Sequence, residues 1–270
     1  MTAADLKNFM SNNERAAWDA CLRSSIVHLE KAREIVRAGE RVEALVVVIS
    51  GWLQRYKERR GRRQIVSLYL PGAISDQSAL TGQAATTTLA AVRDADVALV
   101  DACDAHALFA RYPGLARFRR ASLAATIRIE REWMANLGLR NAEERIAHLC
   151  CELVVRQGKV LKGVVEAALP LNQAQLGEAV GLTPVHVNRT IAQLRRRYGL
   201  TARDRRLRVT DAAGLAALAE FDDSYLEFDE EGLLAGPNEP TPLQSWRNRA
   251  EPVVYCADGC LVGRNARGAA

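Results

Sequence analysis

Arginine side chains gather in one short stretch of the 270-residue sequence. Eight arginines lie between positions 189 and 208, and Asp204 is the single acidic residue in that span. A guanidinium group donates paired hydrogen bonds to phosphate oxygens or to the edge of a guanine, so such a cluster is suited to nucleic acid. A run of one charge also occurs on ordinary solvated surfaces. The element that carries these arginines therefore decides between the two interpretations.

The stretch over residues 171–197 is predicted to form two short helices joined by a glycine turn. Asn172 begins a capping-box pattern for the first helix, and Gly181 is expected to end it. Thr183 is expected to cap the second helix, whose first position is Pro184, where the missing N–H costs nothing. The spacing predicts a helix-turn-helix.

The second of these helices has two different faces. One carries apolar residues at helical spacing, which predicts burial; they are Val187, Ile191 and Leu194. The opposite face presents Asn188 and Arg189 near the N-terminal end, as suits a helix that reads bases in a major groove. The pattern RRLRVT, after the turn-like ARD, predicts the return strand of a wing. The residues predicted to contact DNA are Thr183, Pro184, Val185, His186, Asn188, Arg189, Arg195, Arg205 and Arg206.

Different roles are expected within this set. Arg189 should read a base, most simply a guanine, and Arg205 should contact phosphates. His186 flanks the reading face, where it either touches a phosphate or is a surface residue without function. Helix-turn-helix shapes also occur in proteins that bind no DNA. A small-ligand or protein-interaction module with a vestigial winged helix is therefore the alternative function.

Composition and motifs exclude several other classes. The net charge is +5 with a pI near 9.0, and 270 residues suffice for two domains. The longest apolar run, residues 44–50, has strand length, and no secretory signal is visible, so we expect a cytoplasmic protein without a membrane span. No nucleophile, metal or phosphate-loop motif indicates an enzyme. Cys256 and Cys260 lack the further ligands that a zinc site needs, so no metal is predicted.

The first half of the sequence is predicted to be an antiparallel β domain flanked by helices. Short β-rich runs over residues 42–50, 51–58 and 62–70 are separated by turn-like residues, which is typical of hairpins. Two more strands are expected around a turn at Arg93–Asp94, where Arg93 should point to solvent. A helix is expected from residue 13 to residue 22, and Asp104 is expected to cap another that ends at Arg111.

A long helix is predicted from Pro113 to Leu137, with Gly138 breaking it. One apolar stripe follows a seven-residue rhythm and consists of Leu115, Phe118, Ser122, Ala125, Ile129 and Asn136. A second stripe consists of Leu123, Ile127, Met134 and Leu137. Two stripes imply two buried faces, one against the β domain and one against a partner helix, although a single wide core stripe is the alternative. We expect Ile129 and Asn136 at the seam of a homodimer.

The remaining residues complete four expected segments. The β sensor domain should span residues 13–112, the dimerisation helix and hinge 113–140, and the winged helix-turn-helix 141–225. From residue 226 to residue 270 we expect an acidic linker and a weakly ordered tail, because the composition is rich in Pro, Gly, Arg and acidic residues.

The order of β roll, long central helix and C-terminal winged helix resembles the Crp/Fnr family of bacterial transcription regulators. The residues that carry the resemblance are GWLQRYK (51–57), GRRQI (61–65), LPG (70–72), NAEERIAHLCCEL (141–153) and LTPVHVNRTIAQLRRR (182–197). The resemblance implies an α+β fold with an antiparallel, jelly-roll-like sensor domain. It also implies a homodimer that binds a near-palindromic site in double-stranded DNA, with RNA polymerase as a further candidate partner.

Three departures from the family pattern bear on the effector and the target site. Cyclic-nucleotide-binding members hold the ribose with a Gly-Glu pair and the phosphate with an Arg-Ser pair, and residues 74–78 and 86–88 contain neither. Iron–sulfur members carry clustered N-terminal cysteines, whereas Cys21 stands alone. Val185 replaces the usual glutamate of the recognition helix. We therefore expect no cyclic AMP and no cofactor, the effector is unknown, and the base sequence should differ from that of the cyclic-AMP receptor protein.

Overall fold

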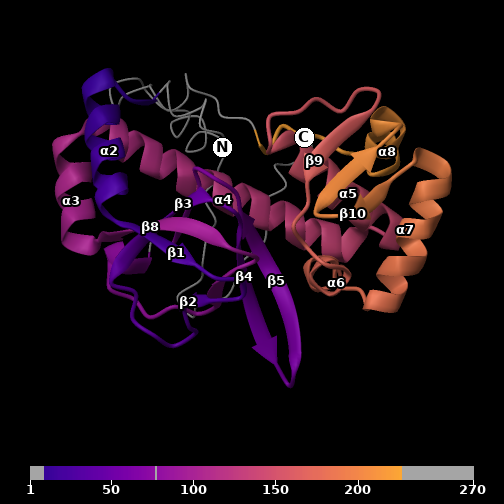
Figure 1. Ribbon diagram of the computed structural model, residues 1–270, viewed down its shortest axis with the longest axis horizontal. Coiled ribbons are helices and arrows are strands. Elements are labelled where there is room, and N and C mark those ends of the chain that lie inside the picture. Colours follow the sequence, from indigo (N-terminus) through magenta and orange to yellow (C-terminus); the bar gives the residue numbers. More distant parts are fainter. Residues whose placement is uncertain (1–8, 77, 227–270) are drawn as a thin grey trace, which may run out of the picture. The chain divides into compact units, whose positions relative to one another are not determined.

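The structure is a computed structural model that describes residues 9–76 and 78–226 (Figure 1). Its first part is a β roll of two four-stranded antiparallel sheets. In one sheet the strands are ordered β1 (Ile26–Leu29), β8 (Ala95–Asp101), β3 (Ala44–Ser50) and β6 (Ile74–Asp76). In the other they are ordered β2 (Glu34–Val36), β7 (Thr88–Ala91), β4 (Leu53–Arg59) and β5 (Arg62–Tyr69). The expected α+β class with an antiparallel β domain is confirmed.

The two sheets bury their facing side chains in one apolar core. Leu53, Leu89 and Val97 are fully buried there, and each contributes about 1.5–3 kcal/mol through removal from water. The long strands β3, β4, β5 and β8 were predicted from their β-rich runs. The strands β1, β2 and β6 were not, because three or four residues carry no readable period and are defined only by their pairing.

Helices flank the roll, and a short 3₁₀ helix (η1, Ser78–Thr81) follows β6. Helix α2 (Asn12–Ser24) starts at Ser11, which forms a capping box with Glu14. The Glu14 carboxylate also accepts a hydrogen bond of 2.7 Å from the amide of Gly114, which ties α2 to the next long helix. Helix α3 (Ala102–Arg111) is capped by Asp101, whose carboxylate accepts a hydrogen bond from the amide of Cys103, and not by Asp104, which lies inside the helix.

Helix α4 (Pro113–Leu139) is the long central helix, and its two apolar stripes differ in burial. The seven-residue stripe faces the chain's own core: Ile129 and Asn136 are only 7 % and 5 % exposed. The expectation that these two residues lie on a dimer seam is therefore wrong. The second stripe is free, with Leu123, Ile127 and Met134 exposed to solvent. Gly138 does not break the helix, which ends at Leu139 where the backbone of the following residue becomes extended.

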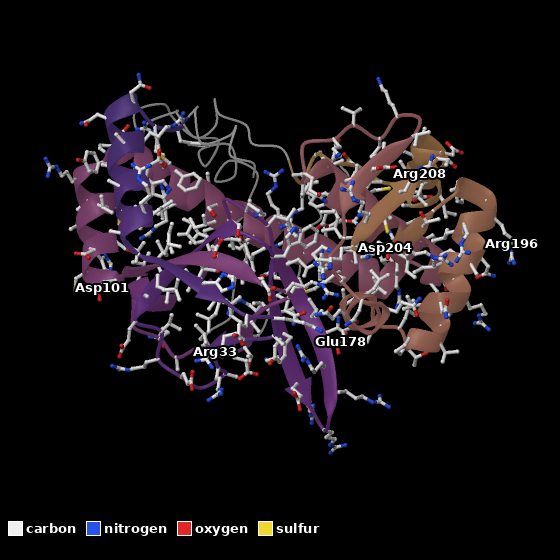
Figure 2. The ribbon with its side chains drawn as sticks, viewed as in Figure 1. Arg33, Asp101, Glu178, Arg196, Asp204 and Arg208 are labelled. Atoms are coloured by element: carbon white, nitrogen blue, oxygen red, sulfur yellow. The ribbon has the colours of Figure 1, made fainter. Side chains whose placement is uncertain are left out.

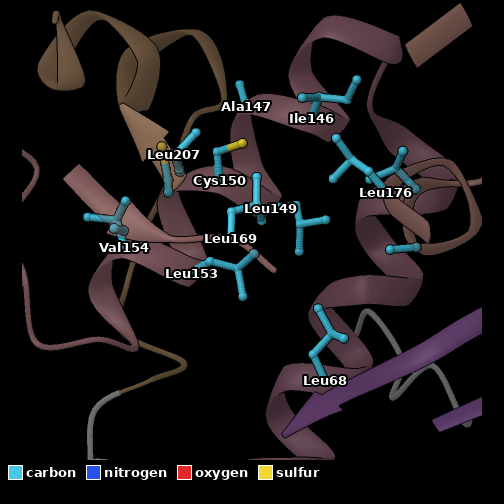
Figure 3. Packing of buried hydrophobic residues seen from close by; sticks show 14 of the residues in the cluster. Leu68, Ile146, Ala147, Leu149, Cys150, Leu153, Val154, Leu169, Leu176 and Leu207 are labelled. Carbon is cyan, nitrogen blue, oxygen red and sulfur yellow. The ribbon is translucent and has the colours of Figure 1, made fainter. Parts of the chain in front are cut away.

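The C-terminal part is a small helical domain with a three-stranded sheet. Its elements are α5 (Ala142–Val155), β9 (Val165–Ala168), α6 (Gln173–Val180), α7 (Pro184–Tyr198), β10 (Thr201–Arg203), β11 (Arg206–Val209) and α8 (Ala212–Leu218). Figure 3 shows part of its core, a cluster that includes Leu149, Leu153, Leu176 and, from the sheet, Leu207. The residues of α5 from Ile146 to Val154 are all buried, including Cys150 and Cys151, which behave as small apolar groups.

Within the described ranges, none of the helices combines the length and the apolar character that crossing a membrane would require. The predictions for the tail, including those for Cys256 and Cys260, fall outside the described residues.

Candidate nucleic-acid interface

Helices α6 and α7 form the predicted helix-turn-helix, and the local sequence explains each boundary. Asn172 and Gln175 make the capping box of α6, and Gly181 ends that helix in the left-handed conformation, at φ 68°. The turn folds back closely on α6: a Cβ at Gly177 would lie 2.4 Å from the carbonyl oxygen of Leu182. Only glycine at position 177 allows this approach, so the angle between the two helices depends on it.

Helix α7 presents a buried and an exposed face as its period predicts. Val187 and Leu194 are fully buried, whereas Val185 is 81 % exposed and Asn188 and Arg189 are exposed beside it. Thr183 caps the helix by accepting a hydrogen bond from the amide of His186. The first turn and a half of α7 therefore offers an amide and a guanidinium group to an external partner.

The wing follows directly after α7. Gly199 ends that helix at φ 64°, and β10 and β11 then form an antiparallel hairpin that β9 extends. Its two-residue turn places Asp204 and Arg205 at φ 51° and 62°, the mirror-image conformation that matches the twist of a hairpin. The hairpin holds Arg205 at its tip.

The arginines of this region fall into two groups, and Figure 2 labels Arg196 and Arg208 among them. Three pair with carboxylates: Arg197 lies 2.8 Å from Glu143, and Arg206 and Arg208 lie 3.9 and 3.2 Å from Glu166. The others have no ion pair among the residues that the structure describes, and they are Arg189, Arg195, Arg196, Arg203 and Arg205.

The structure brings the predicted DNA-contact residues together on α7 and on the wing that follows it. Thr183, Pro184, Val185, Asn188 and Arg189 are exposed, and His186 is half-buried. Arg195, Arg205 and Arg206 are exposed as well, and of these Arg206 is engaged by Glu166. The geometry thus places an exposed polar face of α7 beside arginines that have no ion pair within the described part of the chain.

Sequence reasoning missed a buried polar cluster where α4 meets α5. The carboxylate of Glu152, fully buried, accepts hydrogen bonds from the indole of Trp133 at 3.0 Å and from Arg156 at 3.0 Å. The hydroxyl of Tyr225 donates a third at 2.9 Å. Arg156 also donates to the carbonyl of Leu68, in β5. Glu152 stands within the apolar pattern of α5, and this was the signal in the sequence. A buried carboxylate requires hydrogen-bond donors, so its position indicated a buried polar cluster.

His148 adjoins this cluster. Its ring lies against those of Phe221 and Tyr225, with centroid distances of 5.2 and 6.0 Å. Its Nε2 is 3.2 Å from a carboxylate oxygen of Glu132, although not aligned for a hydrogen bond. Burial, assisted by the nearby charge of Arg140, lowers the pKa of His148 to about 3. The imidazole is therefore neutral at physiological pH.

A cavity of about 360 Å³ lies between the β roll and α4, where a sensor ligand would be expected. Two arginines line it: Arg119 of α4, whose guanidinium lies 5.3 Å from the ring centre of Phe109, and Arg55 of β4, which sequence reasoning did not single out. The Arg55 guanidinium already donates to the hydroxyls of Tyr69 and Thr87, at 3.1 and 2.9 Å, and to the carbonyl of Ser75, at 2.7 Å. The carboxyl group of Glu130 lines the same cavity. Because the Arg55 guanidinium is held by these internal partners and a carboxyl group lines the same cavity, the lining is a poor match for a buried cyclic phosphate.

Arg93 does not point to solvent as expected. Its side chain is half-buried, and its Nε donates to the carbonyl of Pro170 at 3.2 Å. The turn at residues 93–94 is thus fastened to the loop that leads into α6.

Comparisons with known proteins agree with this arrangement. A Crp-like helix-turn-helix domain model matches residues 144–218, and a cyclic nucleotide-binding domain model matches residues 26–112. The transcriptional activator protein FnrA of Stutzerimonas stutzeri is 25 % identical over 192 residues, covering 71 % of this chain and 79 % of the relative. The transcriptional regulatory protein btr of Bordetella pertussis is 22 % identical over 210 residues, covering 77 % and 86 %. The solved structure of FixK2 from Bradyrhizobium japonicum matches with a TM-score of 0.62 and 27 % identity, covering 72 % of this chain and 96 % of that one.

The fold and the interface define a DNA-binding transcription regulator, in which a β roll related to cyclic nucleotide-binding domains precedes a winged helix-turn-helix. Its family is thereby settled: the chain belongs to the Crp/Fnr regulators.

Proposed function

We propose that this regulator binds a near-palindromic DNA site as a homodimer, with α7 of each copy in a major groove. The observation that carries the proposal is the exposed pair Asn188 and Arg189 at the N-terminal end of a helix whose other face is buried. Amide and guanidinium side chains there match the donor and acceptor patterns of adenine and guanine. Arg195 and Arg205 flank this face as phosphate contacts, with Arg206 partly neutralised by Glu166. Thr183, Pro184, Val185 and His186 line the entry of the helix.

The homodimer is supported by the free stripe of α4. Leu123, Ile127 and Met134 follow each other at spacings of four and seven residues, which is the seam of an antiparallel or parallel helix pair. A second copy of the same helix would cover these exposed apolar groups. Two α7 helices related by the resulting two-fold axis would read half-sites about one helical turn apart, ~34 Å. Regulation of transcription makes RNA polymerase a second macromolecular partner.

Selection of bound sequences from random duplexes, with no small molecule added, tests the proposal. We expect a motif with two-fold symmetry and a binding constant that falls steeply with salt. A protein-interaction module with a vestigial winged helix would enrich no motif and show no salt-dependent retardation of DNA. That outcome would overturn the proposal.

A further inference from the structure

The hairpin of β4 and β5 carries a further basic surface, separate in the sequence from that of α7 and the wing. Its residues 57–63 read KERRGRR, with Glu58 as the single acid. The strands stay paired up to Arg59 and Arg62, so the turn consists of Arg60 and Gly61 alone, at φ 53° and 71°. Such a turn continues the twist of the strands, so the tip is a firm projection and not a loose loop (Figure 1).

The cations of this tip are available to an external anion. Lys57, Arg59, Arg60 and Arg62 are exposed, and none of them has an ion pair among the described residues. Figure 2 shows nitrogen-tipped side chains spreading from the end of the hairpin. Arg63 is different: its guanidinium lies 3.7 Å from the ring centre of Tyr56 and 3.8 Å from the carboxylate of Glu178. We define the basic tip as Lys57, Arg59, Arg60 and Arg62.

The base of the hairpin is attached to the helix-turn-helix. Gln64 donates to the carbonyl of Ala179 at 3.3 Å, and Arg63 pairs with Glu178 in the same turn of α6. Nearer the start of α6, Gln175 donates to Gln54 of β4 at 3.3 Å. The hairpin therefore lies along α6, which is the first helix of the motif. In helix-turn-helix complexes the first helix crosses the phosphate backbone while the second enters the groove.

We propose that the basic tip binds phosphates of the duplex on the flank of the sequence that α7 reads. This inference rests on the proposed function. The base of the hairpin contacts α6, the helix expected to meet the backbone, and the four cations of the tip have no ion pair among the described residues. Guanidinium groups on a firm turn lose little conformational freedom when they pair with phosphates. Such contacts would add affinity without base preference.

A matched pair of double variants on two duplexes tests the proposal. Arg60→Glu/Arg62→Glu reverses two charges of the basic tip. Lys31→Glu/Arg33→Glu makes the same change in net charge at two exposed residues between β1 and β2. One duplex ends at the selected motif, and the other is longer by about one helical turn (~10 bp) on each side. Affinity is measured by fluorescence anisotropy over a range of salt concentrations.

We expect the wild type to bind the longer duplex more tightly. The tip variant should lose roughly tenfold or more in affinity on the longer duplex, and its salt slope there should fall by about 0.9 for each lost contact. It should bind the short duplex like the wild type, which also shows that it is folded. The control variant should follow the wild type on both duplexes.

Three outcomes would overturn the inference. The wild type could gain nothing from flanking DNA, the tip variant could bind the longer duplex unchanged, or the control could lose as much affinity as the tip variant. A tip variant that binds DNA normally but fails to support transcription with RNA polymerase would assign the tip to an acidic protein surface instead. Failure of the wild type to bind any duplex would refute the proposed function itself, so the two failures are distinct.

Discussion

The hydroxyl of Tyr225 lies 2.9 Å from a carboxylate oxygen of Glu152, and this contact joins the end of the described chain to the helix that opens the winged domain. The match to the Crp-like helix-turn-helix domain ends at residue 218, so Tyr225 lies beyond that match. Two further hydrogen bonds fix the same segment, from Arg128 to the carbonyl of Ser224 and from Arg140 to that of Ala219. Residues 219–226 thus fasten α4 to α5.

Removing the Tyr225 hydroxyl should destabilise the protein. Tyr225→Phe leaves the ring stacked on His148 but takes one of the donors from a buried carboxylate, which costs about 1–3 kcal/mol. Chemical denaturation followed by tryptophan fluorescence measures the change. Tyr112→Phe is the matched control, because the Tyr112 hydroxyl makes no hydrogen bond within the described ranges. Equal effects of the two substitutions would contradict a role for the contact.

Stability should fall with acidification because His148 is buried in its neutral form. Its pKa is about 3 in the folded state against 6.5 in the unfolded state, so between these values the unfolded chain binds more protons. The contribution is fully present above pH 6.5 and is lost as the pH falls towards 3, with a slope of up to about 1.4 kcal/mol per pH unit.

His148→Phe isolates this effect. Unfolding free energies of the wild type and the variant should converge, or cross, as the pH is lowered from 7 to 5, because the variant lacks the titrating group. The range from pH 7 to 5 lies above most carboxyl pKa values, so the titration of carboxyl groups contributes little to the change in unfolding free energy there. Parallel curves would show that His148 does not carry the pH dependence.

The contrast between these residues and the helix-turn-helix shows what the sequence can predict. The caps Asn172 and Thr183 and the stop at Gly181 act within a few residues of themselves, so their pattern specifies the helix boundaries directly. The apolar period of α7 likewise predicted the buried Val187 and Leu194. Such local physics needs no knowledge of distant elements.

Other features depend on which distant elements meet. Both stripes of α4 consist mainly of apolar residues, so the period predicted two buried faces but could not assign Ile129 to the chain's own core. Arg55 reaches Thr87 from a strand 32 residues away, and Tyr225 reaches Glu152 across 73 residues. No spacing rule connects such pairs, because tertiary packing alone brings them together.

A charge on the free stripe of α4 should separate the dimer. Ile127→Glu would place an unpaired carboxylate in the proposed interface, which is strongly unfavourable, while the folded monomer keeps its core. Sedimentation at micromolar protein should show a dimer for the wild type and a monomer for the variant. Leu139→Glu is the control, since Leu139 is 85 % exposed on the same helix but lies off the stripe. A monomeric wild type would refute the dimer.

Arg189 and Arg205 should differ in the kind of binding energy they supply. Arg189→Ala removes the proposed contact to a base, so it should weaken specific binding by about 1–3 kcal/mol and relax the preference at one position in each half-site. Arg205→Ala removes the proposed phosphate contact, so it should weaken all duplexes alike and lower the salt slope by about 1. Selection from random duplexes with each variant distinguishes the two. An unchanged motif for Arg189→Ala would show that another residue reads that base.

Cyclic nucleotides should not switch this regulator. A buried cyclic phosphate needs a free cation or several converging N–H donors, and leaving its charge unpaired costs several kcal/mol. In the cavity between the β roll and α4, the guanidinium of Arg55 already donates to Tyr69, Thr87 and Ser75, and that of Arg119 lies over the ring of Phe109. Burial raises the pKa of Glu130, whereas the charge of Arg55 and a hydrogen bond from Ser67 lower it. The carboxyl group of Glu130 therefore competes with any anion for the guanidinium of Arg55. Titration calorimetry with cyclic AMP and cyclic GMP should show no binding below about millimolar concentrations, and neither should change DNA affinity. Glu130→Gln removes the competing charge and is the variant most favourable to an anion. A micromolar dissociation constant for the wild type would mean that Arg55 exchanges its internal partners for the phosphate, and it would make this cavity the effector site.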